Sequence, residues 1–258
     1  MLGAIAGDII GSQFNGPLNI KTKRFELFTE GCSFTDDTIC TIAIADALLN
    51  DRDIADSLRD WGNRYGNRGY GSRFWCWVIT PDMPAYQSWG NGGAMRVSPV
   101  GFLYSHDGML AGDIAEKTAV VSHDHLESIR SVRAVTSAIV MAKQGKSAKA
   151  IETELSKQYD YVLWESVADW RRQMTPTVEA AITVPAAIIC ALRSKNVEDA
   201  IRNAVSIGGD SDTIACIAGG IAEAMFDVPE EIEVRVMPYL PDDMKRIVEQ
   251  HYEKLRLK

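Results

Sequence analysis

The sequence predicts an all-α protein built as one compact multi-helix domain over residues 1–258. Apolar side chains recur at the three- and four-residue spacing of amphipathic helices, whereas strict alternation over the length of a strand is hard to find. The chain shows no βαβ rhythm, and no Ser-, Pro- or Gly-rich linker divides it. A chain of 258 residues buries about 70–75% of its unfolded surface, so its core needs neither disulfides nor a structural metal.

The helical segments follow one another along the chain. Residues 37–49 are apolar nearly all round, which predicts a central buried helix. Segments 129–140 and 214–225 each carry one apolar face. Residues 176–193 predict another long buried helix, bent or interrupted at Pro185. Further helices are expected at residues 110–121, 147–158, 197–206 and 242–255.

One part of the chain breaks this helical rhythm. Between Gly62 and Gly93, Gly, Asn, Arg, Pro and aromatic residues crowd together. Irregular stretches of this length are uncommon inside compact helical domains and are usually functional. We therefore expect an irregular binding-loop region here.

Composition and charge narrow the functional class. With 46% hydrophobic and 24% charged residues, the chain is typical of a globular protein and not of a disordered or fibrous one. Its 27 Lys and Arg against 35 Asp and Glu give a formal charge of −8, which argues against a nucleic-acid partner. The only dense basic stretch, residues 21–24, is expected to be a solvated loop.

Cysteine usage and the first residues indicate a cytoplasmic protein. The five cysteines are an odd number without a Cys-x-x-Cys pair, which suits a reducing compartment. The first residues lack a basic segment, and Asp8 interrupts their apolar run, so they do not predict a signal peptide. No segment approaches the roughly 20 uninterrupted apolar residues of a membrane span, so we expect no membrane partner.

Two distant segments share one pattern. Residues 37–43 and 212–218 both read Asp-Thr-Ile-x-x-Ile-Ala. A further acid precedes each segment, Asp36 in the first and Asp210 in the second. Because each segment opens a predicted helix, the sequence places two acids and a threonine at each of two helix starts.

Two interpretations of these acids compete. Asp and Thr are favoured N-cap residues, and acids near a helix start interact favourably with the helix dipole. One cap needs one side chain, however, and here two acids crowd the start of each buried helix. Adjacent buried carboxylates repel each other, and a cation relieves that repulsion. We favour a metal site over simple capping.

The types of residue restrict the metal. Carboxylate and hydroxyl oxygens suit Mg²⁺, Mn²⁺ or Ca²⁺, and four carboxylates in one place can hold two ions. Zinc is disfavoured because the only close histidine pair is His123 and His125, with no cysteine near it in the sequence. Two ions could orient a sugar diol or a phosphate and lower the pKa of a bound water.

A glycine-rich segment covers residues 90–96. Such a segment lets backbone approach a ligand closely and lets amides cradle an anion, although a plain turn leading into a helix explains the glycines as well. Ser88 and Trp89 precede it with a hydroxyl and a stacking surface, as a nucleotide would need. His123 lies between two predicted helices, where a structural role is the commoner one.

Together these segments resemble the ADP-ribosylglycohydrolase family, the ADP-ribosyl-acceptor hydrolases that include dinitrogenase reductase-activating glycohydrolase. The resemblance extends over nearly the whole chain, and its two acidic signatures, in this order, are the most specific part. The segments that carry it are residues 3–11, 34–38, 69–71, 90–99 and 208–213, with His123.

The resemblance implies an all-α domain of the ADP-ribosylglycohydrolase type with a cleft for two Mg²⁺ or Mn²⁺ ions. The metal ligands that it implies are Thr35, Asp36, Asp37, Asp210, Asp212 and Thr213. The ADP-ribose site that it implies is lined by Ser88, Trp89, Gly90, Asn91, Gly92 and His123. The family cleaves the bond between C1″ of the distal ribose and an acceptor on a protein or small molecule, which releases ADP-ribose. The acids that would then be catalytic are Asp36, Asp37 and Asp210.

One position departs from the commonest family pattern. Many members carry Glu where this chain has Asn15, and Asn cannot act as a general base. The arginine-linked branch is similar in having Asn there, so we expect Asn15 in the substrate site and an arginine-type linkage. Glu26, in the following loop, is a candidate substitute for the missing acid. Trp89 stands where Tyr is common and keeps a stacking surface.

Two alternatives stay open. A catalytically weak or inactive relative would keep the metals and bind ADP-ribose without turnover, although intact acids at all four metal positions favour an enzyme. A binuclear hydrolase of another ADP-ribosyl or phosphate compound would fit the metal ligands alone. The glycine-rich segment and the paired acidic signatures favour the first reaction.

Overall fold

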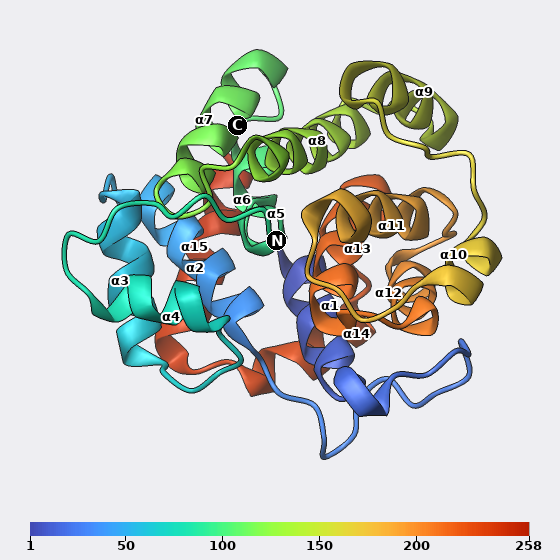
Figure 1. Ribbon diagram of the computed structural model, residues 1–258, viewed down its shortest axis with the longest axis horizontal. Coiled ribbons are helices and arrows are strands. Elements are labelled where there is room, and N and C mark those ends of the chain that lie inside the picture. Colours follow the sequence, from blue (N-terminus) through green and yellow to red (C-terminus); the bar gives the residue numbers. More distant parts are fainter. Residues whose placement is uncertain (258) are drawn as a thin grey trace.

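A computed structural model describes residues 1–257, which form fifteen α-helices and two short 3₁₀ helices (Figure 1). The only extended pairing in this part of the chain is an isolated bridge between Gly90 and Glu179. The helices are α1 (Leu2–Ser12), η1 (Gly16–Leu18), α2 (Asp36–Leu49), α3 (Ile54–Arg64), α4 (Ser72–Ile79), α5 (Gly92–Met95), α6 (Ser98–Leu103), α7 (Gly108–Val120), α8 (Leu126–Lys143), α9 (Ala148–Tyr159), α10 (Val167–Gln173), α11 (Ala180–Leu192), α12 (Val197–Ile207), α13 (Ser211–Phe226), α14 (Glu230–Val236), η2 (Met237–Tyr239) and α15 (Asp242–Arg256). The all-α prediction is confirmed.

The first and thirteenth helices form the central pair of the fold. α1 and α13 lie side by side, although they come from opposite ends of the chain (Figure 1). Gly3, Gly7 and Gly11 recur every fourth residue along the face of α1 that meets α13, so the two backbones approach directly. The sequence reasoning did not predict α1, because three glycines in eleven residues lower helix propensity, and tertiary packing overrides that preference.

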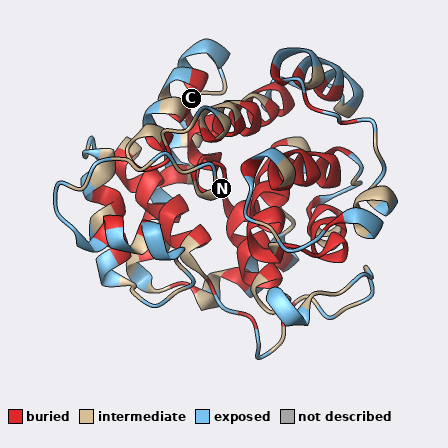
Figure 2. Cartoon of the chain, in the orientation of Figure 1, coloured by how far each residue is buried: buried red, intermediate tan, exposed pale blue. Residues whose placement is uncertain are grey.

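A continuous hydrophobic core surrounds this pair. α8, α11 and α12 pack against α13 on one side, and α2 packs against α1 on the other. α1, α2, α11 and α13 are buried along nearly their whole lengths, whereas α9 and α15 expose one face (Figure 2). The buried span from Asp37 to Ala47 confirms the central position predicted for this helix.

Most predicted helices occur within a few residues of their expected limits, and the differences have local causes. The helix expected at residues 176–193 begins only at Ala180, because Val178 and Glu179 pair with the segment around Gly90. Pro185 lies within α11 without interrupting it, so an interruption there is wrong.

The stretch between Gly62 and Gly93 is less irregular than predicted. It contains α4, whose Phe74, Trp77 and Val78 form a buried apolar stripe at helical spacing. The surrounding glycines and prolines obscured this short pattern in the sequence. Five further helices, α3, α5, α6, α10 and α14, were also not predicted.

The basic stretch at residues 21–24 is not simply a solvated loop. Lys21 donates hydrogen bonds to the carbonyls of Met174 and Ile207, and Lys23 pairs with Asp199. These contacts fasten the segment after α1 to the end of α12, just before the loop that leads into α13. Within residues 1–257, no helix combines the length and apolarity needed to cross a membrane.

Candidate active site

A cavity of about 650 Å³ opens where α2 and α13 begin. All residues that the sequence analysis assigned to the metal and substrate sites line it: Asn15, Thr35, Asp36, Asp37, Ser88, Trp89, Gly90, Asn91, Gly92, His123, Asp210, Asp212 and Thr213. Glu26 does not line this cavity, so it does not stand in for an acid at Asn15.

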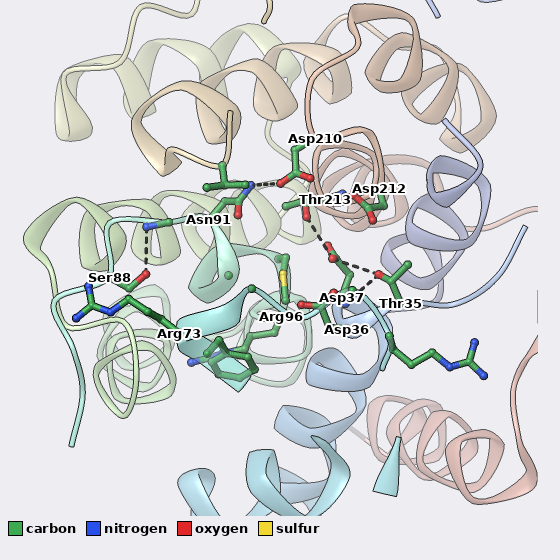
Figure 3. Close-up of a pocket in the computed structure, with 18 of the residues that line it drawn as sticks. Thr35, Asp36, Asp37, Arg73, Ser88, Asn91, Arg96, Asp210, Asp212 and Thr213 are labelled. Atoms are coloured by element: carbon green, nitrogen blue, oxygen red, sulfur yellow. Dashed lines mark hydrogen bonds between the residues drawn. The ribbon is translucent and has the colours of Figure 1, made fainter. Parts of the chain in front are cut away.

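The two echoed helix starts meet inside this cavity. Thr213 at the start of α13 donates a hydrogen bond of 3.2 Å from Oγ1 to Oδ2 of Asp37 in the first turn of α2. Figure 3 shows this bond between Thr213 and Asp37. Segments that begin 175 residues apart (212 − 37) thus face each other, as their shared pattern suggested.

Helix capping explains only one of these residues. Thr35 is the N-cap of α2, and its Oγ1 accepts a hydrogen bond of 3.2 Å from the amide of Asp37. Asp210 is the N-cap of α13, but its side chain makes no capping hydrogen bond. It accepts one of 2.8 Å from Nδ2 of Asn91 instead. The acids therefore do more than cap their helices.

Asp8 of α1 completes the acid cluster and was missed by the sequence analysis. Its carboxylate accepts hydrogen bonds from the amide and hydroxyl of Thr35, at 2.9 and 2.7 Å, and from the amide and hydroxyl of Thr38. One carboxylate oxygen each of Asp8, Asp37 and Asp212 lie within 4.8 Å of one another. The available signal was an acid inside an otherwise apolar, buried helix.

Burial raises the pKa values of these carboxyl groups. Loss of solvent, and then the charge of Asp212, raise the pKa of Asp8 to about 7. The same two causes raise the pKa of Asp210 to about 7. The pKa values of Asp36 and Asp37 are raised well above their usual range, by burial first and then by the neighbouring carboxylates.

These residues fit divalent cations. Oδ1 of Asp37 is buried and has no hydrogen-bond partner within residues 1–257, so it is available to a cation. Carboxylates and hydroxyls are the ligands that Mg²⁺ and Mn²⁺ prefer, and a cation would offset the mutual repulsion of the acids. The lining side chains that could hold such ions are Thr35, Asp36, Asp37, Asp210, Asp212 and Thr213, and Asp8 offers a further carboxylate oxygen.

The glycine-rich loop is anchored to the segment before α11. The amide of Asn91 donates to the carbonyl of Val178 at 3.0 Å, and the amide of Ala180 donates to the carbonyl of Trp89 at 3.2 Å. This pairing sets the backbone from which Asn91 reaches Asp210. Val178 itself lines the cavity, and the sequence held no signal for it.

Asn15 holds the start of α13 in place. Its Oδ1 accepts hydrogen bonds of 2.9 and 3.3 Å from the amides of Ser211 and Asp212, and its Nδ2 donates to Oδ2 of Asp212. Asn19 supports the same loop through a 2.7 Å bond from the amide of Gly209. A carboxylate at position 15 could not donate to Asp212, which is a physical reason for an amide there.

The loop after α3 covers Asp36. The amide of Asp36 donates to the carbonyl of Arg68 at 2.8 Å. Gly69 follows with φ at +97°, and a Cβ there would lie 3.1 Å from Oδ1 of Asp36, so only glycine fits well. Arg68 and Arg73 line the cavity as well and were not predicted.

His123 also lines the cavity and is buried against two aromatic rings. Its ring centroid is 5.8 Å from those of Phe74 and Tyr86. A Cβ at Gly92 would come within 2.7 Å of His123 Nε2, which explains the glycine at this position. Trp89, by contrast, is about half exposed, at 49%.

Comparisons with known proteins agree with this architecture. A sequence profile of the ADP-ribosylglycohydrolase family matches residues 1–256. An uncharacterized protein of Archaeoglobus fulgidus is 27% identical, and the alignment covers 89% of this chain and 88% of that protein. ADP-ribosylhydrolase ARH3 of Danio rerio is 25% identical over 88% of this chain and 82% of its own length.

A solved structure supports the fold independently. An ADP-ribosylglycohydrolase-related protein complex matches with a TM-score of 0.74 at 22% identity, covering 98% of this chain and 97% of that one. The structure defines the class of protein as an all-α fold with a carboxylate-lined cavity between two helix starts. The chain belongs to the ADP-ribosylglycohydrolase family, and it is a glycohydrolase enzyme.

Proposed function

We propose that this enzyme hydrolyses the bond between C1″ of ADP-ribose and a modified acceptor on a protein or small molecule, and so releases ADP-ribose. The observation that carries the proposal is the meeting of the α2 and α13 starts, which gathers Asp8, Asp37 and Asp212 beside the glycine-rich loop. Membership of the ADP-ribosylglycohydrolase family indicates that the substrate carries an ADP-ribosyl group.

We propose two Mg²⁺ or Mn²⁺ ions as cofactors, held by the side chains of the two helix starts. Bound ions would polarise the hydroxyls of the ribose and lower the pKa of a bound water. The unpartnered Oδ1 of Asp37 and the raised pKa values of the acids support this assignment. The proposed ligands are Thr35, Asp36, Asp37, Asp210, Asp212 and Thr213.

Three aspartates are proposed to act on the substrate directly. Asn91 orients Asp210 through its 2.8 Å hydrogen bond, and the carboxylate of Asp210 would take a proton from water. Asp36 and Asp37 line the same cavity, where their charge would stabilise the positive charge that develops at C1″ during glycoside cleavage. The residues proposed to bind substrate are Asn15, Ser88, Trp89, Gly90, Asn91, Gly92 and His123.

The preferred linkage is proposed to be of the arginine type. Asn15 has no ionisable side chain that could protonate a leaving group, and Glu26 does not line the cavity. A serine oxygen leaves as an alkoxide unless an acid protonates it, whereas a protonated guanidinium leaves as a neutral guanidine. A site without an acid at position 15 therefore suits the guanidine better.

The deciding experiment incubates the protein and Mg²⁺ separately with arginine-linked and serine-linked ADP-ribosyl peptides and measures free ADP-ribose. Faster release from the arginine-linked peptide is the expected result. Faster release from the serine-linked peptide would contradict the linkage. Release from neither, with tight binding of ADP-ribose, would indicate a non-catalytic binding protein.

We also propose that residues 1–258 act as one cytoplasmic domain. One hydrophobic core extends from α1 to α15, and all five cysteines are free thiols, as a reducing compartment favours. The net charge of −8 makes a nucleic-acid acceptor the less favoured choice.

A further inference from the structure

Arg96, at the end of α5, is a buried cation without a carboxylate partner. Its side chain is fully buried and forms none of the ion pairs among residues 1–257. The titratable groups that face it are the thiol of Cys40, the phenol of Tyr86 and the imidazole of His123. Burying an unpaired charge is costly, so a buried guanidinium on a cavity wall calls for a specific role.

The C-terminal end of α7 receives this guanidinium. Nη2 of Arg96 donates a hydrogen bond of 2.7 Å to the carbonyl of Thr118, in the last turn of α7. The negative end of the helix dipole partly offsets the buried positive charge. The same nitrogen donates to Oγ of Ser122 at 2.9 Å, which ties Arg96 to the residues that follow the helix.

The backbone after α7 fixes the next two side chains. The amides of Ser122 and His123 both donate to the carbonyl of Ala119, at 3.1 and 2.7 Å. This geometry brings Oγ of Ser122 to 2.8 Å from Nδ1 of His123. Arg96, Ser122 and His123 therefore form one continuous chain of hydrogen bonds.

Donor and acceptor roles along this chain leave one consistent arrangement. Arg96 can only donate, so Oγ of Ser122 accepts from it. Ser122 is fully buried, and Nδ1 of His123 is the only group within residues 1–257 placed to accept its single hydrogen. A proton on Nδ1 would leave that buried hydroxyl hydrogen without an acceptor. The ring proton of His123 therefore belongs on Nε2.

The Nε2 atom lies beside Gly92, another residue that lines the cavity. It lies against the backbone of Gly92, where a Cβ would come within 2.7 Å, and His123 lines the cavity. Among residues 1–257, no group forms a hydrogen bond with Nε2. Burial, and next the charge of Arg96, hold the pKa of His123 well below its usual range, so the ring stays neutral.

We propose that Arg96 and Ser122 are positioning residues that hold His123 as a neutral Nε2–H donor to an oxygen of the bound ADP-ribosyl group. This inference rests on the proposed function for the identity of the ligand, but the proton position belongs to the free protein. His123 then binds substrate and exchanges no proton with it during the reaction.

The first test measures the ¹⁵N chemical shifts of both ring nitrogens of His123 in the ligand-free protein near neutral pH. The expected spectrum shows a proton on Nε2 and none on Nδ1. A proton on Nδ1, or on both nitrogens, would overturn the proposal. Because no substrate is present, this result does not depend on whether the proposed reaction is correct.

The second test compares Ser122→Ala with Ser122→Thr, which keeps a hydroxyl. In Ser122→Ala, loss of the bond to Nδ1 should let the ring proton move between the two nitrogens. The Kd for ADP-ribose and the KM should then rise by roughly 3- to 10-fold, with kcat changed less. Ser122→Thr should restore both the spectrum and KM. Unchanged ¹⁵N shifts of the His123 ring in a folded Ser122→Ala protein would contradict the positioning role of Ser122.

A matched control separates this role from ordinary packing. Ser131 of α8 is also buried and hydrogen-bonded, to the hydroxyl of Tyr161 at 3.2 Å, but it does not line the cavity. Ser131→Ala should leave the His123 spectrum and KM unchanged. Failure of the wild-type protein to bind ADP-ribose would refute the proposed function and the ligand contact, whatever the spectrum shows.

Discussion

Gly7 of α1 lies so close to Ala215 of α13 that a Cβ at Gly7 would come within 2.0 Å of the Ala215 carbonyl oxygen. The close approach continues at Gly11, where a Cβ would lie 2.6 Å from the carbonyl oxygen of Ser211. Asp8 follows Gly7 directly, so this backbone contact is also what brings Asp8 to the start of α13 and the acid cluster.

Gly7→Ala should therefore destabilise the protein strongly. The added methyl group meets backbone, which cannot turn aside as a side chain can, so a loss of about 3 kcal/mol is expected. Urea denaturation measures it. Gly108→Ala is the control, because its Cβ would lie 3.5 Å from Val140, an ordinary contact. Equal stabilities for the two variants would show that α1 and α13 are not so tightly packed.

Asp212→Ala should abolish most activity and the stabilisation by Mg²⁺. Loss of one ligand leaves an ion under-coordinated, so a rate reduction of roughly 10²- to 10³-fold is expected, together with loss of the metal-dependent rise in Tm. Asp36→Ala should behave alike. Asp113→Ala is the control, since this exposed acid pairs with Arg133 at the surface and should change neither quantity. A metal-dependent Tm rise in Asp212→Ala equal to wild type would refute the ligand assignment.

Asn15→Ala should lower metal affinity, whereas Asn19→Ala should lower stability alone. Both side chains hold the loop before α13, but only Asn15 contacts the carboxylate of Asp212. Each variant is expected to lose about 1–2 kcal/mol of folding free energy. Mg²⁺ titrations monitored by calorimetry distinguish them. The same metal affinity in both variants would mean that Asn15 only supports the loop.

Stabilisation by Mg²⁺ should increase with pH. The folded protein raises the carboxyl pKa values of five acids above their unfolded values, so it holds their protons more tightly than the unfolded chain does. Without a cation, their contribution to stability is therefore greatest at low pH and falls as pH rises from about 4 towards 7. The acids concerned are Asp8, Asp36, Asp37, Asp210 and Asp212.

Protons and cations compete for these same oxygens, which gives the test. The rise in Tm on adding Mg²⁺ should be larger at about pH 8 than at about pH 5, because fewer protons must then be displaced. Thermal denaturation at both pH values, with and without Mg²⁺, measures the difference. A larger rise at the lower pH would contradict a carboxylate site.

Local sequence patterns predicted most of the helices that extend over three or more turns, although the eleven-residue α3 was not found. α8, α12 and α13 were found this way, because side chains on one face of a long helix repeat often enough to be recognised. α4 was missed because it spans only eight residues among glycines and prolines. α1 was missed because its glycines lower helix propensity. Their role is to let the backbone of α13 approach closely, which local propensity does not show.

The candidate site divides in the same way. The acids at Asp37 and Asp212 could be identified from the sequence, because the two segments that contain them share one residue pattern. Asp8 and Val178 carry no such pattern, and neither does the chain from Arg96 through Ser122 to His123. Their roles depend on which partner lies opposite, and several of those partners are backbone amides or carbonyls.

The sequence by itself determined that this protein is helical and that two acidic helix starts belong to one site. Both conclusions rest on periodicity and repetition, which are properties of the chain. Only the tertiary structure decided that Asp8 joins those acids, that Asn15 is occupied with Asp212, and that Glu26 lies outside the cavity. Those relationships depend on how closely α1 approaches α13, and packing between distant segments, not local propensity, sets that distance.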